Sequence, residues 1–126
     1  MKDLVQNFTQ QLKEAKTIAE KAVVSNESTI HNILITGLGG SGIGGTIISE
    51  LISDSCKVPV LINKDYFLPA FVDKHTLVVI SSYSGNTEET ISVLDKAIAC
   101  GAQIVCVTSG GKVFESAKQH HFDFIQ

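Results

Sequence analysis

Hydrophobic residues recur along this chain at two different spacings, which predicts strands alternating with helices. Short apolar runs at 33–35, 58–62, 77–81, 103–108 and 122–125 are typical of five buried strands. An N-terminal amphipathic helix is predicted by apolar residues in steps of three and four, at Leu4, Phe8, Leu12, Ala15, Ala19 and Ala22. Further helical patterns follow the first, third and fourth strands, over about 43–51, 86–101 and 112–120.

Strands that are apolar almost throughout indicate a parallel sheet buried on both faces, because parallel strands need crossover connections that are usually helices. The predicted fold class is therefore α/β, with a doubly wound three-layer αβα arrangement around a mostly parallel sheet of about five strands. The N-terminal helix either covers this sheet or meets another subunit. Residue Pro69 argues against a long helix between the second and third strands.

Composition narrows the class of protein. The 126 residues, 44% of them hydrophobic, suffice for one core, so we expect one domain spanning 1–126. A net charge of −3 with scattered lysines gives no basic surface for nucleic acid. The apolar runs are far shorter than the ~20 residues that cross a bilayer, and no secretory signal opens the chain. We therefore expect a cytoplasmic protein that binds neither nucleic acid nor membrane.

Three cysteines, Cys56, Cys100 and Cys106, are odd in number and lack the spacing of metal ligands. They are expected to be reduced and mostly buried thiols. The adjacent His120 and His121 would point about 100° apart on a helix, so they do not make a shared metal site. We expect no metal and no cofactor.

A glycine-rich segment at 37–45 follows the first strand and opens the next helix. Gly44 and Gly45 would each destabilise that helix by ~1 kcal/mol relative to alanine. Their presence predicts a close approach of the backbone to a ligand or to a neighbouring strand.

A hydroxyl-rich segment at 81–90 follows the third strand. Hydroxyl donors combined with the free N–H groups of a helix start form a cradle for one anion, and here that cradle contains no lysine. Helix capping is the simpler interpretation, with Asn86 as N-cap and Glu89 three residues later. Capping does not account for Ser82, Ser84 and Thr87 together, so we favour an anion site.

The two segments are similar to loops of the sugar isomerase (SIS) domain, with GLGGSGIGG at 37–45 and SSYSGNTEET at 81–90. Two more segments resemble, in the same order, the N-terminal half of the bifunctional phosphoglucose/phosphomannose isomerase family. These are Asp65-Tyr66 followed by Leu68-Pro69-Ala70-Phe71, and the segment TSGGK at 108–112. The resemblance covers nearly the whole chain.

This resemblance implies a ligand and a site. The ligand would be a hexose 6-phosphate, and the partner a second copy in a homodimer. By position, the phosphosugar-binding residues fall on Gly39, Gly40, Ser41, Ser82, Ser84 and Thr87.

The family interconverts glucose 6-phosphate or mannose 6-phosphate with fructose 6-phosphate, which needs a general base and an arginine. In the family these groups lie later in the chain, and this sequence has no arginine. We therefore expect the phosphosugar-binding domain of a longer two-domain isomerase, with no catalytic residue of its own. Whether the chain alone is an enzyme stays open.

Two alternatives remain. A nucleotide-binding Rossmann module is suggested by Gly37, Gly39 and Gly42 in a G-x-G-x-x-G pattern, with Asp65 where a ribose-binding acid is expected. That pattern alone is weak, and the loop at 81–90 has no part in it. A non-catalytic phosphosugar sensor would use the same pocket without chemistry.

Overall fold

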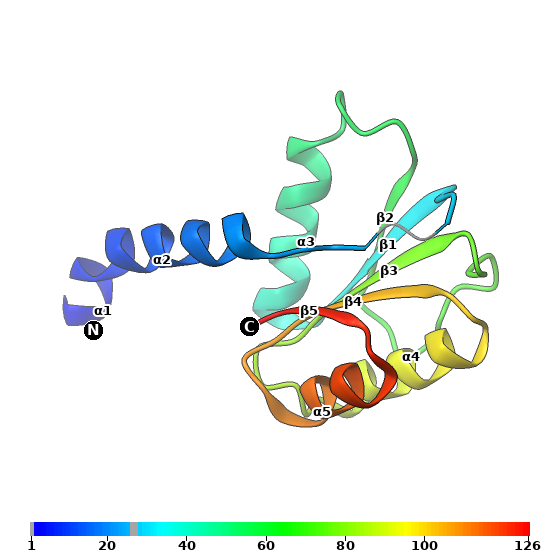
Figure 1. Cartoon of the computed structure of the whole chain (residues 1–126). Helices are drawn as coiled ribbons and strands as arrows, with labels where there is room; N and C mark the ends of the chain where they lie inside the picture. The colour runs from blue at the N-terminus through cyan, green and yellow to red at the C-terminus, as the bar shows by residue number, and fades with distance from the viewer. Residues whose placement is uncertain (1, 26–27) are drawn as a thin grey trace.

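Five parallel strands form one sheet in the computed structural model, which describes residues 2–25 and 28–126 (Figure 1). The order across the sheet is β2-β1-β3-β4-β5. The strands are β1 (Asn32–Thr36), β2 (Val60–Asn63), β3 (Thr76–Ser81), β4 (Gln103–Val107) and β5 (Asp123–Ile125). The helices are α1 (Lys2–Gln6), α2 (Phe8–Lys21), α3 (Gly39–Leu51), α4 (Glu88–Ala99) and α5 (Gly111–His120).

The core lies between the sheet and the helices α4 and α5. Leu34, Val78, Ile80 and Cys106 point from the central strands into this layer and are almost completely buried. Burial raises the pKa of the Cys106 thiol to about 11. Helix α3 covers the opposite face over β1 and β2, so the parallel α/β fold expected from the sequence is confirmed.

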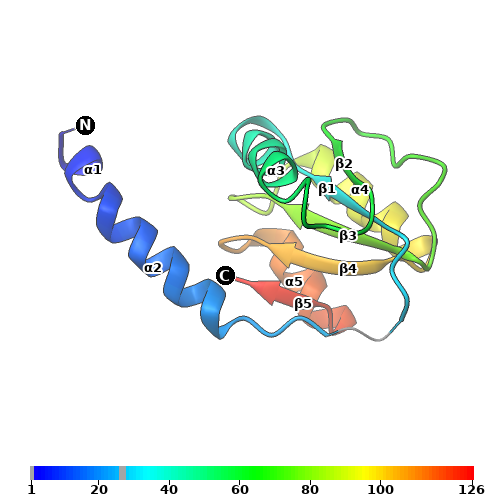
Figure 2. The ribbon, with the colours of Figure 1, turned by 90° about the horizontal axis from the view of Figure 1, so that it is seen from above.

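Helices α1 and α2 project away from the sheet as an arm (Figures 1 and 2). None of residues 8–21 is buried. The arm is amphipathic, as predicted, but it covers neither face of the sheet within this chain. The side chain of Leu4, which begins the predicted pattern, lies outside the description.

Most element boundaries lie within a few residues of the sequence prediction, and two of the differences have clear reasons. Strand β2 begins at Val60, two residues later than expected, since Pro59 has no amide hydrogen to donate to a ladder. Helix α4 begins at Glu88 with Thr87 as its N-cap, two residues after the predicted start at Asn86. The Asn86 side chain has another partner, described below.

Across the described residues no helix has both the length and the apolar character needed to cross a membrane. The three cysteines are free thiols, but only Cys106 is buried, whereas Cys56 is half-buried and Cys100 is exposed. The expectation that they are mostly buried is therefore wrong. His31 and His75 stack on each other with ring centroids 4.5 Å apart, at the amino-terminal edge of the sheet. That edge lies opposite the loops considered next.

Candidate phosphosugar site

A cavity of about 490 Å³ lies at the carboxyl ends of the neighbouring strands β1 and β3. In a parallel α/β sheet this is the edge where ligands bind. The residues that line the cavity come from both segments singled out in the sequence, namely Leu38, Gly40, Ser41, Ser81, Ser82, Tyr83, Ser84 and Thr87.

The glycines of the first loop let its backbone approach its neighbours closely. A Cβ on Gly37 would lie 2.9 Å from the carbonyl oxygen of Ser81, and a Cβ on Gly42 would lie 2.6 Å from the carbonyl oxygen of Gly37. Both distances are shorter than packing allows, so these glycines bring the turn after β1 against the end of β3. A Cβ on Gly45 would meet Ile35 at 2.9 Å, whereas one on Gly44 would meet nothing within 4 Å. The expected approach to a neighbouring strand is thus confirmed for Gly45 only.

The hydroxyls of the second loop divide into an inner pair and an outer member. Ser82 is buried, and its Oγ lies 3.1 Å from Thr87 Oγ1 and accepts a hydrogen bond from the Gly85 amide at 3.2 Å. Ser84 is exposed, and its Oγ accepts a 3.3 Å hydrogen bond from the Asn86 amide. The inner pair fixes the loop, while Ser84 lines the cavity with an exposed hydroxyl.

Two helix N-termini open beside this cavity without a side-chain cap. Neither Leu38, the N-cap of α3, nor Thr87, the N-cap of α4, makes a side-chain capping bond. The first N–H groups of a helix generally lack intrahelical acceptors and carry the positive end of the helix dipole. In α3 the Ser41 amide donates to the carbonyl of Leu38 at 3.1 Å. Together they provide an electropositive concave surface lined by hydroxyl groups.

The predicted N-cap role of Asn86 on α4 is wrong. Asn86 Oδ1 instead accepts a 3.1 Å hydrogen bond from the Lys112 amide in the first turn of α5. The Val113 amide donates to the carbonyl of Gly85 at 3.0 Å. The start of α5 is therefore capped by the second loop, whereas the start of α4 stays open.

A third segment, Thr108 to Lys112, packs against the second loop and is hydrogen-bonded to it. The Ser109 amide donates to the carbonyl of Tyr83 at 3.1 Å. Gly85, with φ +67, sits so close to this segment that a Cβ would lie 1.9 Å from the carbonyl oxygen of Gly110. We call the paired segments 82–86 and 108–113 the clasp. The close packing of the clasp also explains the glycine at 111 after β4, because a Cβ on Gly111 would lie 2.4 Å from the carbonyl oxygen of Ser84.

The two acids at the start of α4 do not line the cavity. A hydrogen bond to Glu89, with smaller contributions from desolvation and from the charges of Glu89 and Glu88, raises the pKa of the Tyr66 hydroxyl. Glu89 is therefore engaged with the loop after β2. Lys96 fixes the same loop by donating to the carbonyl of Tyr66 at 3.2 Å.

Five of the six residues predicted from the sequence line this one cavity. The sixth, Gly39, does not line it; Gly39 is the residue before Gly40 and has a φ of +53. Their role in binding stays a prediction. Sequence reasoning did not single out Leu38, Ser81 or Tyr83 as site residues. Tyr83 lines the cavity and is 83% exposed.

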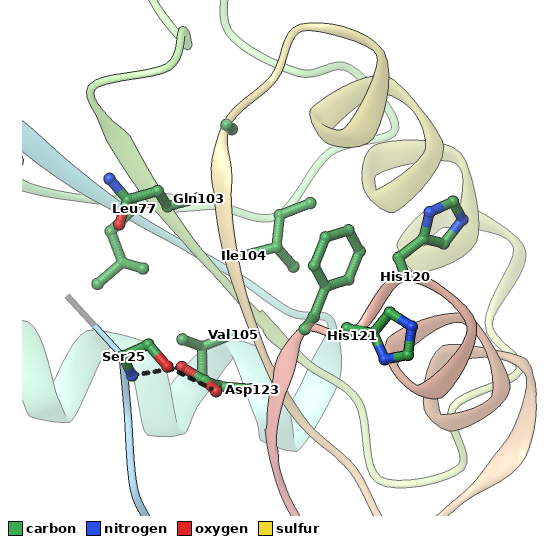
Figure 3. A pocket seen from close by; sticks show the side chains of 10 residues that line it. Ser25, Leu77, Gln103, Ile104, Val105, His120, His121 and Asp123 are labelled. Carbon is green, nitrogen blue, oxygen red and sulfur yellow. Dashed lines mark hydrogen bonds between the residues drawn. The ribbon is translucent and has the colours of Figure 1, made fainter. Parts of the chain in front are cut away.

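Another cavity, of about 260 Å³, lies at the opposite end of the sheet, by the amino ends of β3, β4 and β5 (Figure 3). There Ser25 bonds the Asp123 carboxylate through its amide and its hydroxyl. His120 and His121 line one side, at the end of α5. Among the described residues no group of acids, histidines and cysteines is arranged to hold a metal ion.

No protein-family model matches the chain. The chain is 47% identical, over 126 residues, to the bifunctional phosphoglucose/phosphomannose isomerase of Caldicellulosiruptor bescii. That match covers 99% of this chain and 37% of the relative. This chain is a SIS domain of the phosphoglucose/phosphomannose isomerase type. It spans little more than a third of the length of that relative.

Solved structures agree on the SIS fold. The tagatose-6-phosphate ketose/aldose isomerase of Escherichia coli has a TM-score of 0.62 at 16% identity, over 90% of this chain and 33% of that one. The sugar isomerase domain of an RpiR transcription factor from Sphaerobacter thermophilus has a TM-score of 0.63 at 14% identity. That match covers 84% of this chain and 65% of the other. The SIS domain is thus shared by proteins named as enzymes and as regulators.

Proposed function

We propose that this SIS domain binds a hexose 6-phosphate, with the phosphate group held between the N-termini of α3 and α4. The observation that carries the proposal is the pair of uncapped helix starts opening on one hydroxyl-lined cavity. Backbone N–H groups and helix dipoles at such a point favour a dianion. Ser41 and Ser84 add hydroxyl donors, and Gly40 offers backbone to the sugar.

The similarity to phosphoglucose/phosphomannose isomerases supports a further proposal about chemistry. The domain belongs to a longer two-domain cytoplasmic isomerase that interconverts glucose 6-phosphate or mannose 6-phosphate with fructose 6-phosphate and acts as a homodimer. The described lining of the cavity contains no carboxylate or imidazole to act as general base. We therefore assign binding to this chain and proton transfer to residues outside it.

Calorimetric titration with fructose 6-phosphate tests the binding proposal, with unphosphorylated fructose as the ligand control. Saturable binding is expected for the phosphorylated sugar only. Ser84→Ala removes one donor to a charged group, a loss of roughly 1.5–3 kcal/mol, so affinity should fall about tenfold or more. Ser92→Ala, on α4 but outside the cavity, is the matched control and should bind like the original chain. Equal affinities for the two sugars would refute the phosphate site.

A sensor without catalysis is a second candidate, supported by the regulator that shares this fold. Binding alone does not separate the two. An assay of fructose 6-phosphate isomerisation by the longer protein that contains this domain does. Turnover there supports the enzyme, whereas binding without turnover favours the sensor.

The nucleotide-binding alternative predicts a different ligand. The cavity is walled by the loop after β3, which the dinucleotide pattern does not require. A larger shift of melting temperature with NAD than with fructose 6-phosphate would favour the nucleotide.

A further inference from the structure

The clasp fixes the near end of the second loop through Ser109. Strands β3 and β4 are neighbours in the sheet, so the loops that follow them leave it side by side. The carbonyl of Tyr83 accepts two hydrogen bonds from Ser109, one from its amide at 3.1 Å and one from its hydroxyl. Ser109 is exposed and has no apolar side chain to pack into the core. Its hydroxyl therefore acts on the position of Tyr83.

The far end of the second loop is fixed by the start of α5. Asn86 Oδ1 accepts a hydrogen bond from the Lys112 amide at 3.1 Å, and the Gly85 carbonyl accepts one from the Val113 amide at 3.0 Å. Both amides lie in the first turn of α5, where a helix offers them no acceptor of its own. They are paired only while the two halves of the clasp stay together, so they report directly on its closure.

The turn that carries Ser109 is held in place independently of the second loop. Thr108 is buried at the end of β4. Its Oγ1 accepts a hydrogen bond from the Gly110 amide at 3.2 Å and donates one to the Gly110 carbonyl at 2.9 Å. Ser109 lies between these two residues, so a closed turn on the sheet sets its position.

Ser84 lies between the two fixed ends of the second loop, and its exposed hydroxyl lines the candidate cavity. The packing behind it is close, because a Cβ on Gly111 would lie 2.4 Å from the Ser84 carbonyl oxygen. With Tyr83 bound on one side and Gly85 on the other, the Ser84 backbone has little freedom. A loop that is ordered in the free protein avoids the cost of being ordered when a ligand binds.

We propose that Ser109 is a positioning residue for the candidate anion site. Its hydroxyl holds the Tyr83 carbonyl and thereby sets the place of the Ser84 hydroxyl before a ligand arrives. Ser109 does not line that cavity, so it acts through the loop and not on the ligand. The effect on ligand affinity rests on the proposed phosphosugar function, whereas the hold of Ser109 on the clasp does not.

Hydrogen exchange of the Val113 amide, followed by nitrogen-15 NMR without ligand, tests the hold on the clasp. Ser109→Ala removes the hydroxyl bond and should speed this exchange about threefold to tenfold, the effect of one ordinary hydrogen bond. Ser109→Thr keeps a hydroxyl and should exchange at the original rate. Unchanged exchange of Val113 in Ser109→Ala would overturn the proposal.

Ser55→Ala is the matched control for these measurements. Ser55 is also an exposed serine, and its hydroxyl also donates to a backbone carbonyl, that of Ile52 at 3.3 Å. It follows α3 and takes no part in the clasp. This variant should leave the exchange of Val113 unchanged.

Calorimetric titration with fructose 6-phosphate tests the consequence for the ligand. Ser109→Ala should raise the dissociation constant at least threefold, Ser109→Thr should restore it, and Ser55→Ala should match the original chain. A loss of stability in urea unfolding with an unchanged dissociation constant would show a structural role alone and overturn the positioning role. If the original chain bound no fructose 6-phosphate, the proposed function would fail, while the exchange of Val113 would still decide whether Ser109 holds the clasp.

Discussion

Gly85 is the position where the fold and the candidate site depend on each other most directly. Its φ of +67 lies in the left-handed region, where an alanine costs about 1–2 kcal/mol. A Cβ there would also lie 1.9 Å from the carbonyl oxygen of Gly110. The two halves of the clasp must then separate, which breaks the hydrogen bond from the Val113 amide to the carbonyl of Gly85. The polar groups left unpaired cost the fold a further ~1–3 kcal/mol.

Gly85→Ala should therefore lower the free energy of unfolding by roughly 3 kcal/mol or more. Gly101→Ala is the matched control, because Gly101 has φ +74 but no atom within 4 Å of its missing Cβ. It should lose only the conformational contribution, about 1–2 kcal/mol. Urea unfolding followed by circular dichroism measures both. If the two variants lost the same stability to within about 0.5 kcal/mol, the close contact in the clasp would be refuted.

Three further predictions follow from single residues. Gly44→Ala should stabilise the chain by up to ~1 kcal/mol in urea unfolding, since its Cβ meets nothing in this chain; a loss of stability would show a hidden contact. Asn86→Ala should remove the cap on the Lys112 amide and lower stability by ~1 kcal/mol, with a smaller loss for Asn86→Asp, which keeps an acceptor. Burial raises the pKa of Cys106 from 9.0 to about 11, so its contribution to stability is full below pH 9 and lost as pH rises through 11. Cys106→Val should flatten the fall in stability between pH 9 and 11, and an unchanged profile would contradict this.

The order of strands and helices could be predicted from the sequence because strand and helix leave different hydrophobic spacings. The parallel sheet followed from strands that are apolar throughout, such as 77–81. The position of the arm could not be predicted. An amphipathic stripe shows which face of a helix seeks a partner, but not whether that partner belongs to the same chain.

The candidate site was predictable in its residues and not in its connections. Ser41, Ser82, Ser84 and Thr87 stand where loops follow strands, so the sequence places them at one edge of the sheet. Asn86 was assigned to the wrong helix because a capping pattern is local, whereas its partner Lys112 lies 26 residues later. Tyr83 lines the cavity from the same loop, but it belongs to no periodic apolar pattern that would have marked it.

The central claim is that the starts of α3 and α4 hold one phosphate group together. Amide chemical shifts in a nitrogen-15 NMR titration with fructose 6-phosphate test it most directly. The account predicts saturable shifts for the amides of Ser41 and Ser84 and of the first turn of α4, absent with fructose. Shifts confined to the other end of the sheet, around Ser25 and His121, would contradict it.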